Sequence, residues 1–185
     1  MGAIKTPLPV KLIMPMFTCD ASLFERAEEA LTPCFGPLDY RSARLPFAHT
    51  AYYTPEFGAP LLRQFMTFER LIDPGNLAAI KHHTNALEQR LSQAGKRRIN
   101  LDPGYISAAK LVLATTKDHS HRIYLGQGIY AEITLSYHHG DWQTLPWTYP
   151  DYASDTYQAI LREVRALYMA QLRELRLQGM VNVEG

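Results

Sequence analysis

The stretch RIYLGQGIYAEITL, residues 122–135, carries the clearest structural signal in this sequence of 185 residues. Apolar residues occupy the odd positions on both sides of Gly126-Gln127-Gly128, and polar or aromatic residues occupy most of the even positions. Alternation with a period of two is typical of a β-strand that buries one face. Two such segments joined by a short glycine-containing loop predict an antiparallel hairpin.

The alternation also predicts which residues face each other across the hairpin. Both apolar sets can face the core only if odd positions pair with odd positions, and a three-residue glycine loop allows this register. The predicted pairs are Leu125 with Ile129, Ile123 with Ala131, Tyr124 with Tyr130, and Arg122 with Glu132. The other face of the hairpin would carry Arg122, Tyr124, Tyr130, Glu132 and Thr134.

A third strand is predicted upstream of the hairpin. If Asp118-His119-Ser120 forms a turn, residues 110–117 pair with the first hairpin strand, and Ala114 lies beneath the tyrosines of the hairpin. Small side chains at Ala114 and Val112 would leave a shallow concavity rimmed by Arg122, Glu132 and Thr116. The basic residues at one end of it are Lys117, His119 and His121. We take this concavity as the candidate site.

The residue types around the concavity suit an anionic ligand. The guanidinium of Arg122 can bind a carboxylate or phosphate through two hydrogen bonds, and Lys117 supplies a second cation. His121 or Glu132 can transfer protons, and the two tyrosines can stack against a planar ligand. The alternative interpretation needs no ligand: Arg122 and Glu132 form an ordinary cross-strand pair worth about 0.2–1 kcal/mol.

The remaining sequence predicts an α+β fold. Asp20 is placed to cap the first helix, and Asp73-Pro74 begins the second. Asp102-Pro103-Gly104 predicts a type II turn with a positive φ at the glycine. The predicted strands are 10–17, one or two within 38–53, 61–71, 98–101, 110–117, 122–125 and 129–137, and the predicted helices are 23–35, 74–94 and 154–177.

This element order is consistent with a ferredoxin-like βαββαβ core that is extended by an antiparallel β-meander, with a C-terminal helix packed on the sheet. No linker or repeat divides the chain, so we predict a single domain over residues 1–185, with an ordered core over about 10–178. Residues 61–71 also allow a helix, but the strong helix signal that follows favours a strand. Residues 55–58 are interpreted as a loop.

Composition restricts the classes of function. The chain is 46% hydrophobic and 20% charged with a net charge of +1, so disorder is excluded and nothing attracts it to nucleic acid or an anionic membrane. The N-terminal segment lacks the features of a signal peptide, and no apolar run is long enough to span a membrane. With two cysteines in no metal or redox spacing, we expect a soluble cytoplasmic protein.

Several motif matches are discarded. Gly126 to Ala131 fits GxGxxA, but a strand follows it instead of the helix that a dinucleotide site requires. The sequence contains no P-loop and no GxSxG motif. Lys96-Arg97-Arg98 is interpreted as a solvated face. His119 and His121, with Asp118 and Asp102 as possible additions, have no established metal-ligand spacing, so we predict no metal site.

Five strings in this order resemble an uncharacterised bacterial family, domain of unknown function DUF4416, over nearly the whole chain. They are Thr50-Ala51-Tyr52-Tyr53 with Glu56-Phe57-Gly58, Asn100 to Tyr105, Lys110 to Tyr124, Gly128 to Glu132, and Trp147 to Tyr152. The family's more usual residues are aspartate at position 51 and methionine at position 57. The resemblance implies no reaction and no cofactor, and the GTP-binding label of some members has no P-loop to support it here. It does imply that polar motifs gather at Asp102, Lys117, His121, Arg122, Glu132 and residues 149–151.

Two functions remain open. In the first, an anionic, phosphorylated or nucleotide-like small molecule is bound or converted on the polar sheet face. The candidate catalytic residues are then His121, Glu132 and Asp102, and the candidate ligand-binding residues are Lys117, Arg122, Tyr124, Tyr130, Tyr149 and Asp151. In the second, the aromatic loop 142–152 binds a protein partner or a second copy of the chain. RNA binding on the tyrosine-bearing face is a weaker third hypothesis.

Overall fold

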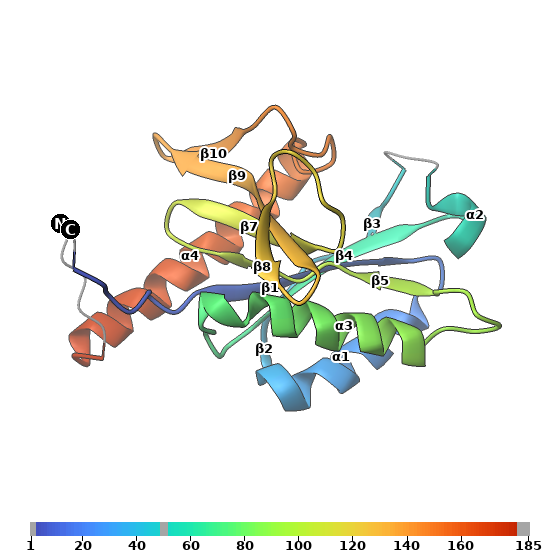
Figure 1. Ribbon diagram of the computed structural model, residues 1–185, viewed down its shortest axis with the longest axis horizontal. Coiled ribbons are helices and arrows are strands. Elements are labelled where there is room, and N and C mark those ends of the chain that lie inside the picture. Colours follow the sequence, from blue (N-terminus) through green and yellow to red (C-terminus); the bar gives the residue numbers. More distant parts are fainter. Residues whose placement is uncertain (1–2, 49–51, 181–185) are drawn as a thin grey trace.

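The computed structural model describes residues 3–48 and 52–180, and its centre is an antiparallel sheet of 10 strands (Figure 1). The strand order is β10-β9-β7-β6-β1-β4-β2, with β5 added to β1, β3 to β4 and β8 to β9. The strands are β1 (Lys11–Thr18), β2 (Leu38–Arg41), β3 (Leu45–Pro46), β4 (Leu62–Phe68), β5 (Ile99–Leu101), β6 (Gly104–Ile106), β7 (Lys110–Thr115), β8 (Ile123–Gly126), β9 (Ile129–His138) and β10 (Asp141–Thr144).

Helices cover both faces of this sheet (Figure 1). They are α1 (Ser22–Phe35), the single turn α2 (Thr54–Phe57), α3 (Leu77–Arg90), which follows a short 3₁₀ turn at Pro74–Asn76, and the C-terminal α4 (Asp155–Leu177). The predictions of a mixed helix and sheet fold, a large antiparallel sheet and a C-terminal helix are confirmed. Among the described residues, no helix combines the length and apolar character needed to cross a bilayer.

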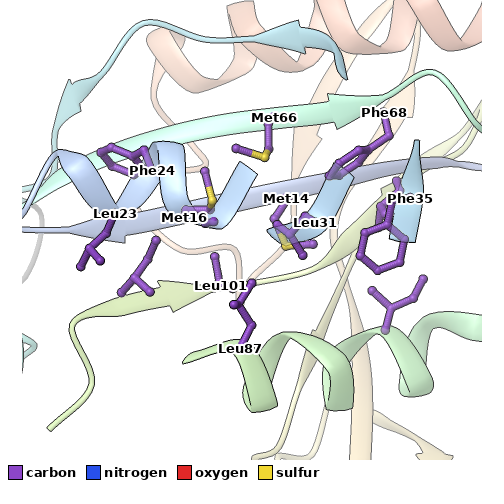
Figure 2. Packing of buried hydrophobic residues seen from close by; sticks show 14 of the residues in the cluster. Met14, Met16, Leu23, Phe24, Leu31, Phe35, Met66, Phe68, Leu87 and Leu101 are labelled. Atoms are coloured by element: carbon purple, nitrogen blue, oxygen red, sulfur yellow. The ribbon is translucent and has the colours of Figure 1, made fainter. Parts of the chain in front are cut away.

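Strand β1 lies at the centre of the core, and all of its residues are buried. Its alternation divides the core between the two faces of the sheet, because successive side chains of a strand point to opposite sides. Met14 and Met16 pack with α1 and α3, as Figure 2 shows, whereas Ile13 packs with α4. One edge of β1 pairs with β4, and the other edge pairs first with β6 and then with β5.

The predicted starts of the second and third helices agree with the structure. Asp20 accepts from the backbone N–H of Ser22 at 3.0 Å, but the N-cap position of α1 is Ala21 and not Asp20 as predicted. The hydroxyl of Ser154 accepts a hydrogen bond from the backbone N–H of Tyr157 at the first turn of α4. Asp73 accepts one from the backbone N–H of Gly75 just before α3. Residues 62–68 form a strand, as predicted. Residues 54–57 form a helical turn instead of the predicted loop, and Tyr52 and Tyr53 precede it in a turn instead of a strand.

The hairpin of β8 and β9 forms with part of the predicted register. Ile123 pairs with Ala131 and Tyr124 with Tyr130, but Gly126 instead of Leu125 lies opposite Ile129. The loop contains two residues instead of three, because Gln127 and Gly128 both take positive φ, at 54° and 75°. This is the backbone conformation of the two-residue turns that suit the twist of a hairpin.

The predicted position of the hairpin relative to β7 is wrong. Strands β7 and β8 pair with opposite edges of β9, so Ala114 lies opposite Ala131 and the concavity beneath the tyrosines does not form. The odd-numbered residues of β9 also do not all lie on one buried face. The register of β7 and β9 shifts between Leu111 and Val112, and such an irregularity changes which face of the sheet the following side chains of β9 point to. Ile123 is 70% exposed, whereas Glu132 is buried.

Buried tyrosines of α4 predict a loss of stability at alkaline pH. Burial raises the pKa of Tyr157 and of Tyr168 from 10.0 to about 12. The unfolded chain therefore loses these protons first, and stability falls as the pH rises from 10 to 12, by about 2 kcal/mol for each tyrosine. Chemical denaturation across this range measures the loss. Tyr168→Phe should reduce it, and an equal loss in this variant would contradict the assignment.

Candidate functional site

A cleft of about 800 Å³ lies beside β5 and β7. The strands β5 and β6 pair with the same edge of β1, and β7 pairs with β6. The walls of the cleft come from β4, α3, β7, the segment 52–56 and the loop 149–152. This volume lies within the range of about 300–1,000 Å³ that is typical of small-molecule sites. The charged residues of the lining are Glu56, Arg63, Lys81, Glu88, Arg97, Asp102, Lys117, Glu132 and Asp151.

The structure brings some of the candidate residues from the sequence into this cleft. Those that line it are Asp102, Lys117, Glu132, Tyr149 and Asp151. Arg122 and His121 lie behind the wall, where both contact Glu132. Tyr124 and Tyr130 lie on the hairpin outside the lining, with ring centroids 5.2 Å apart.

Arg63 is a cation in the lining that sequence reasoning missed. Its side chain is 4% exposed, and Nη2 donates to Oδ2 of Asp151 at 3.2 Å. The guanidinium carbon lies 4.3 Å from the ring centroid of Phe47 and 5.3 Å from that of Phe17. The Nε and Nη1 groups of Arg63 have no hydrogen-bond partner among the described atoms. Its signal in the sequence is a lone arginine inside a strand that is otherwise buried.

Two buried residues of α3 occupy the free edge of β5. Lys81 donates to the carbonyl oxygen of Leu101 at 2.8 Å, and Glu88 accepts from the backbone N–H of the same residue at 2.6 Å. These side chains replace the hydrogen bonds that a neighbouring strand would supply. Burial raises the pKa of Glu88, and the charge of Lys81 opposes this shift.

Asp102 lies at the bend between β5 and β6, with its side chain 32% exposed. Its Oδ2 accepts a hydrogen bond from Nδ2 of Asn100 at 2.6 Å. Lys81 Nζ lies 3.6 Å from Oδ1, and Arg63 Nη1 lies 3.9 Å from Oδ2. Asp102 is therefore close to two cations that come from different elements of the fold.

Arg97 binds carboxylates at the rim of the cleft, so the prediction of a solvated face at residues 96–98 is wrong for this residue. Its Nε and Nη2 donate to Glu56 at 2.7 and 2.9 Å, and Nη1 lies 3.3 Å from Glu88. The hydrogen bonds from Arg97 lower the pKa of Glu56. This ion pair connects α2 to the segment before β5.

Glu132 lines the cleft and is the centre of a cluster that continues behind the wall. It is 3% exposed, and its Oε2 accepts from Nε of Arg122 at 2.8 Å and lies 3.1 Å from Nε2 of His121. Arg122 also donates to the carbonyl oxygen of Lys117 and to Oη of Tyr149, each at 2.9 Å. The predicted contact between Arg122 and Glu132 is confirmed.

The aromatic loop divides between core and surface. Trp142 and Tyr152 are buried, so their rings are not exposed to a partner. Trp147 stacks on His121 with ring centroids 5.0 Å apart, and its Nε1 donates to the carbonyl oxygen of Ile133. Tyr149 is 41% exposed and lines the cleft.

No metal-binding group of three or more His, Cys, Asp or Glu side chains occurs within residues 3–48 and 52–180. The rings of His119 and His121 lie with centroids 5.9 Å apart. The closest charged contact of His121 is with Glu132, which Arg122 already neutralises. The prediction of no metal site stays a prediction.

The fold and the cleft define a class: a mixed α and β protein with helices on both faces of a large antiparallel sheet and a polar cleft at one end. The family model described as "Domain of unknown function (DUF4416)" matches residues 8–168. The chain belongs to this family, as its sequence strings predict. Searches of curated proteins and of solved structures gave no match.

Proposed function

We propose that this protein binds an anionic small organic molecule in the cleft. The observation that carries the proposal is the lining itself, which gathers cations from distant elements around a volume of about 800 Å³. Arg63 comes from β4, Lys81 from α3, and Lys117 follows β7. Such convergence of charged groups in a concave site is typical of ligand binding and is not required for packing.

The hydrogen bonds of the lining favour an anion over a cation. Glu56, Glu88 and Glu132 each accept hydrogen bonds from arginine or backbone donors, so their negative charge is compensated. Arg63 is paired with Asp151 and lies 3.9 Å from Asp102, but its Nε and Nη1 have no hydrogen-bond acceptor. An oxygen of a bound anion would supply the missing acceptor, and partial exclusion of water in the cleft would strengthen this contact.

We also infer that the first half of the chain is a ferredoxin-like core. The strands β5, β1, β4 and β2 lie in this order, and every neighbouring pair is antiparallel. The order supports a βαββαβ arrangement in which α1 and α3 share one face of the sheet. The meander of β6, β7, β9 and β10 then extends the free part of the β1 edge, and the cleft forms where the two parts separate.

A cytoplasmic location is part of the same proposal. Cys19 and Cys34 are exposed and unpaired, which suits the reducing conditions of that compartment.

Ligand-dependent thermal stability tests the binding proposal. Wild-type protein is heated with inorganic phosphate, glycerol phosphate, acetate or citrate. A probe at about a hundredfold its Kd should stabilise the fold by about 2.7 kcal/mol, which is roughly 5–10 °C in Tm. Lys117→Ala should weaken binding by about tenfold, because a charge-assisted hydrogen bond is lost.

Lys110→Ala is the matched control, since Lys110 is on the same strand segment but outside the lining of the cleft. It removes the same charge and should bind as wild type. If no anion stabilises the wild-type protein, or if both lysine variants lose binding equally, the cleft is not the anion site.

A further inference from the structure

Arg122 makes three hydrogen bonds but is not part of the cleft lining. Its side chain is 5% exposed, and Nε, Nη1 and Nη2 donate to Glu132, to the carbonyl oxygen of Lys117 and to Oη of Tyr149. Three of the five N–H groups of the guanidinium are thus bound within the protein. The sequence suggests Arg122 as a direct ligand for an anion, but its side chain is buried outside the lining of the cleft and each of its nitrogens has a partner in the protein.

The contact with Arg122 fixes how Tyr149 can bind. A phenol that accepts a hydrogen bond from a guanidinium still has its own O–H to donate. Tyr149 is in the lining of the cleft, so this donor is available to a molecule bound there. A tyrosine is protonated at neutral pH, and burial raises the pKa of Tyr149 further, to about 12.

The same guanidinium fixes the chain at Lys117. The carbonyl oxygen of Lys117 accepts from Arg122, and its backbone N–H donates to the hydroxyl of Thr115 at 3.2 Å. The Lys117 ammonium lies 5.2 Å from the ring centroid of Tyr52, another residue of the lining. Residues 117 and 149 are far apart in the sequence, and Arg122 holds both at one wall.

We propose that Lys117 and Tyr149 form an oxoanion-binding subsite of the cleft, and that Arg122 is a positioning residue that holds both without touching the ligand. This inference rests on the proposed function. Glu132 neutralises Arg122, so the subsite presents the single positive charge of Lys117 and one phenol donor. This combination suits a terminal carboxylate or phosphate, whose oxygens accept both hydrogen bonds.

A double-mutant cycle tests the assignment, with inorganic phosphate and acetate as separate probes. Tyr149→Phe should weaken binding of the responsive probe by about tenfold, because it removes the phenol donor. Arg122→Lys should weaken it by about tenfold or more, because it releases Lys117 as well as Tyr149. The double variant should bind no more weakly than Arg122→Lys alone, since that change already removes the oriented phenol donor. The probe that responds shows whether the oxoanion is a phosphate or a carboxylate.

Tyr130→Phe is the control, because Tyr130 lies outside the lining of the cleft. The Tyr130→Phe protein should bind the probe as tightly as the wild type. A double variant that binds about tenfold more weakly than Arg122→Lys alone would contradict the assignment, because Tyr149 would then act independently of Arg122. An Arg122→Lys variant with lower Tm but unchanged affinity would show that Arg122 is only structural. If Arg122→Lys does not fold, Tyr149→Phe decides alone: wild-type affinity in that variant overturns the subsite.

The result also separates the two proposals. A wild-type protein that responds to no probe contradicts anion binding altogether. A wild-type response that depends on Lys117 but not on Tyr149 or Arg122 contradicts only the subsite and leaves the cleft as the binding site.

Discussion

Gly104→Ala should destabilise the protein by about 3 kcal/mol or more, at the high end of the cost of overpacking a core. A Cβ atom at this position would lie 2.3 Å from the carbonyl oxygen of Val112 and 2.6 Å from Cδ2 of Leu113. The first of these contacts is with backbone, so no side-chain rotation can relieve it. Gly104 pairs with Ile13 of β1 on one side and with Leu113 of β7 on the other, so the strand cannot move away from both neighbours.

Denaturant unfolding measures this effect, with Gly75→Ala as the control. A Cβ at Gly75 would meet only the side chain of Asp73, with Oδ1 at 3.1 Å and Cγ at 3.9 Å, and this side chain needs to move by only a few tenths of an ångström. We expect Gly75→Ala to change the free energy of unfolding by less than about 1 kcal/mol. Gly104→Ala with the stability of wild type would show that the close approach of β6 and β7 is not required.

Gly104 also shows how one residue type can be interpreted in two ways. Within Asp102-Pro103-Gly104, the sequence predicts a turn with positive φ at the glycine. The structure has the glycine at the first position of a paired strand, and its φ is not positive. It is needed there because a neighbouring backbone approaches closely, which is the other reason for glycine in a strand. Only the close pairing with β7, the next strand along the chain, separates the two interpretations.

For the hairpin of β8 and β9, the sequence predicts the pairing within the hairpin but not the neighbours of the hairpin in the sheet. The pairs Ile123 with Ala131 and Tyr124 with Tyr130 follow from alternation and a short loop, so they were predictable. The edge of β9 that β8 occupies was not, because alternation is the same for either edge of a strand. In the structure, β7 holds one edge, and β8 and β10 share the other.

The site was predictable where polar residues occur in recognisable strings. Asp102, Lys117 and Glu132 belong to such strings and do line the cleft. Arg63 has only a weak signal, as a lone arginine inside a buried strand, and Lys81 is a single charge on a helix that nothing local distinguishes from a solvated residue. Their roles depend on where β4 and α3 meet the rest of the sheet, which the sequence alone does not give.

Lys11→Met should destabilise the protein by about 3–5 kcal/mol, the usual cost of breaking a buried ion pair from one side. Lys11 is fully buried, and its Nζ donates to the carbonyl oxygen of Phe68 at 2.8 Å, to Gln171 at 2.9 Å and to Asp39. Burial lowers the pKa of Lys11, and its hydrogen bond to Asp39 opposes this shift. Methionine has a similar length but leaves the carboxylate of Asp39 without its cation, although Thr67 still donates to it.

The effect of Asp39→Asn on stability, alone and in the Lys11→Met background, distinguishes an ion pair from simple packing. Asp39→Asn alone should also destabilise, because the charge of Lys11 is then buried without a counter-charge. In the Lys11→Met background, the same change should restore part of the lost stability, since asparagine carries no charge to bury and can still accept from Thr67. Denaturant unfolding of the four proteins gives this cycle directly. If the changes in unfolding free energy of the two single variants add up to that of the double variant, Lys11 stabilises the contact of β1, β2 and α4 by its hydrocarbon chain and not by its charge.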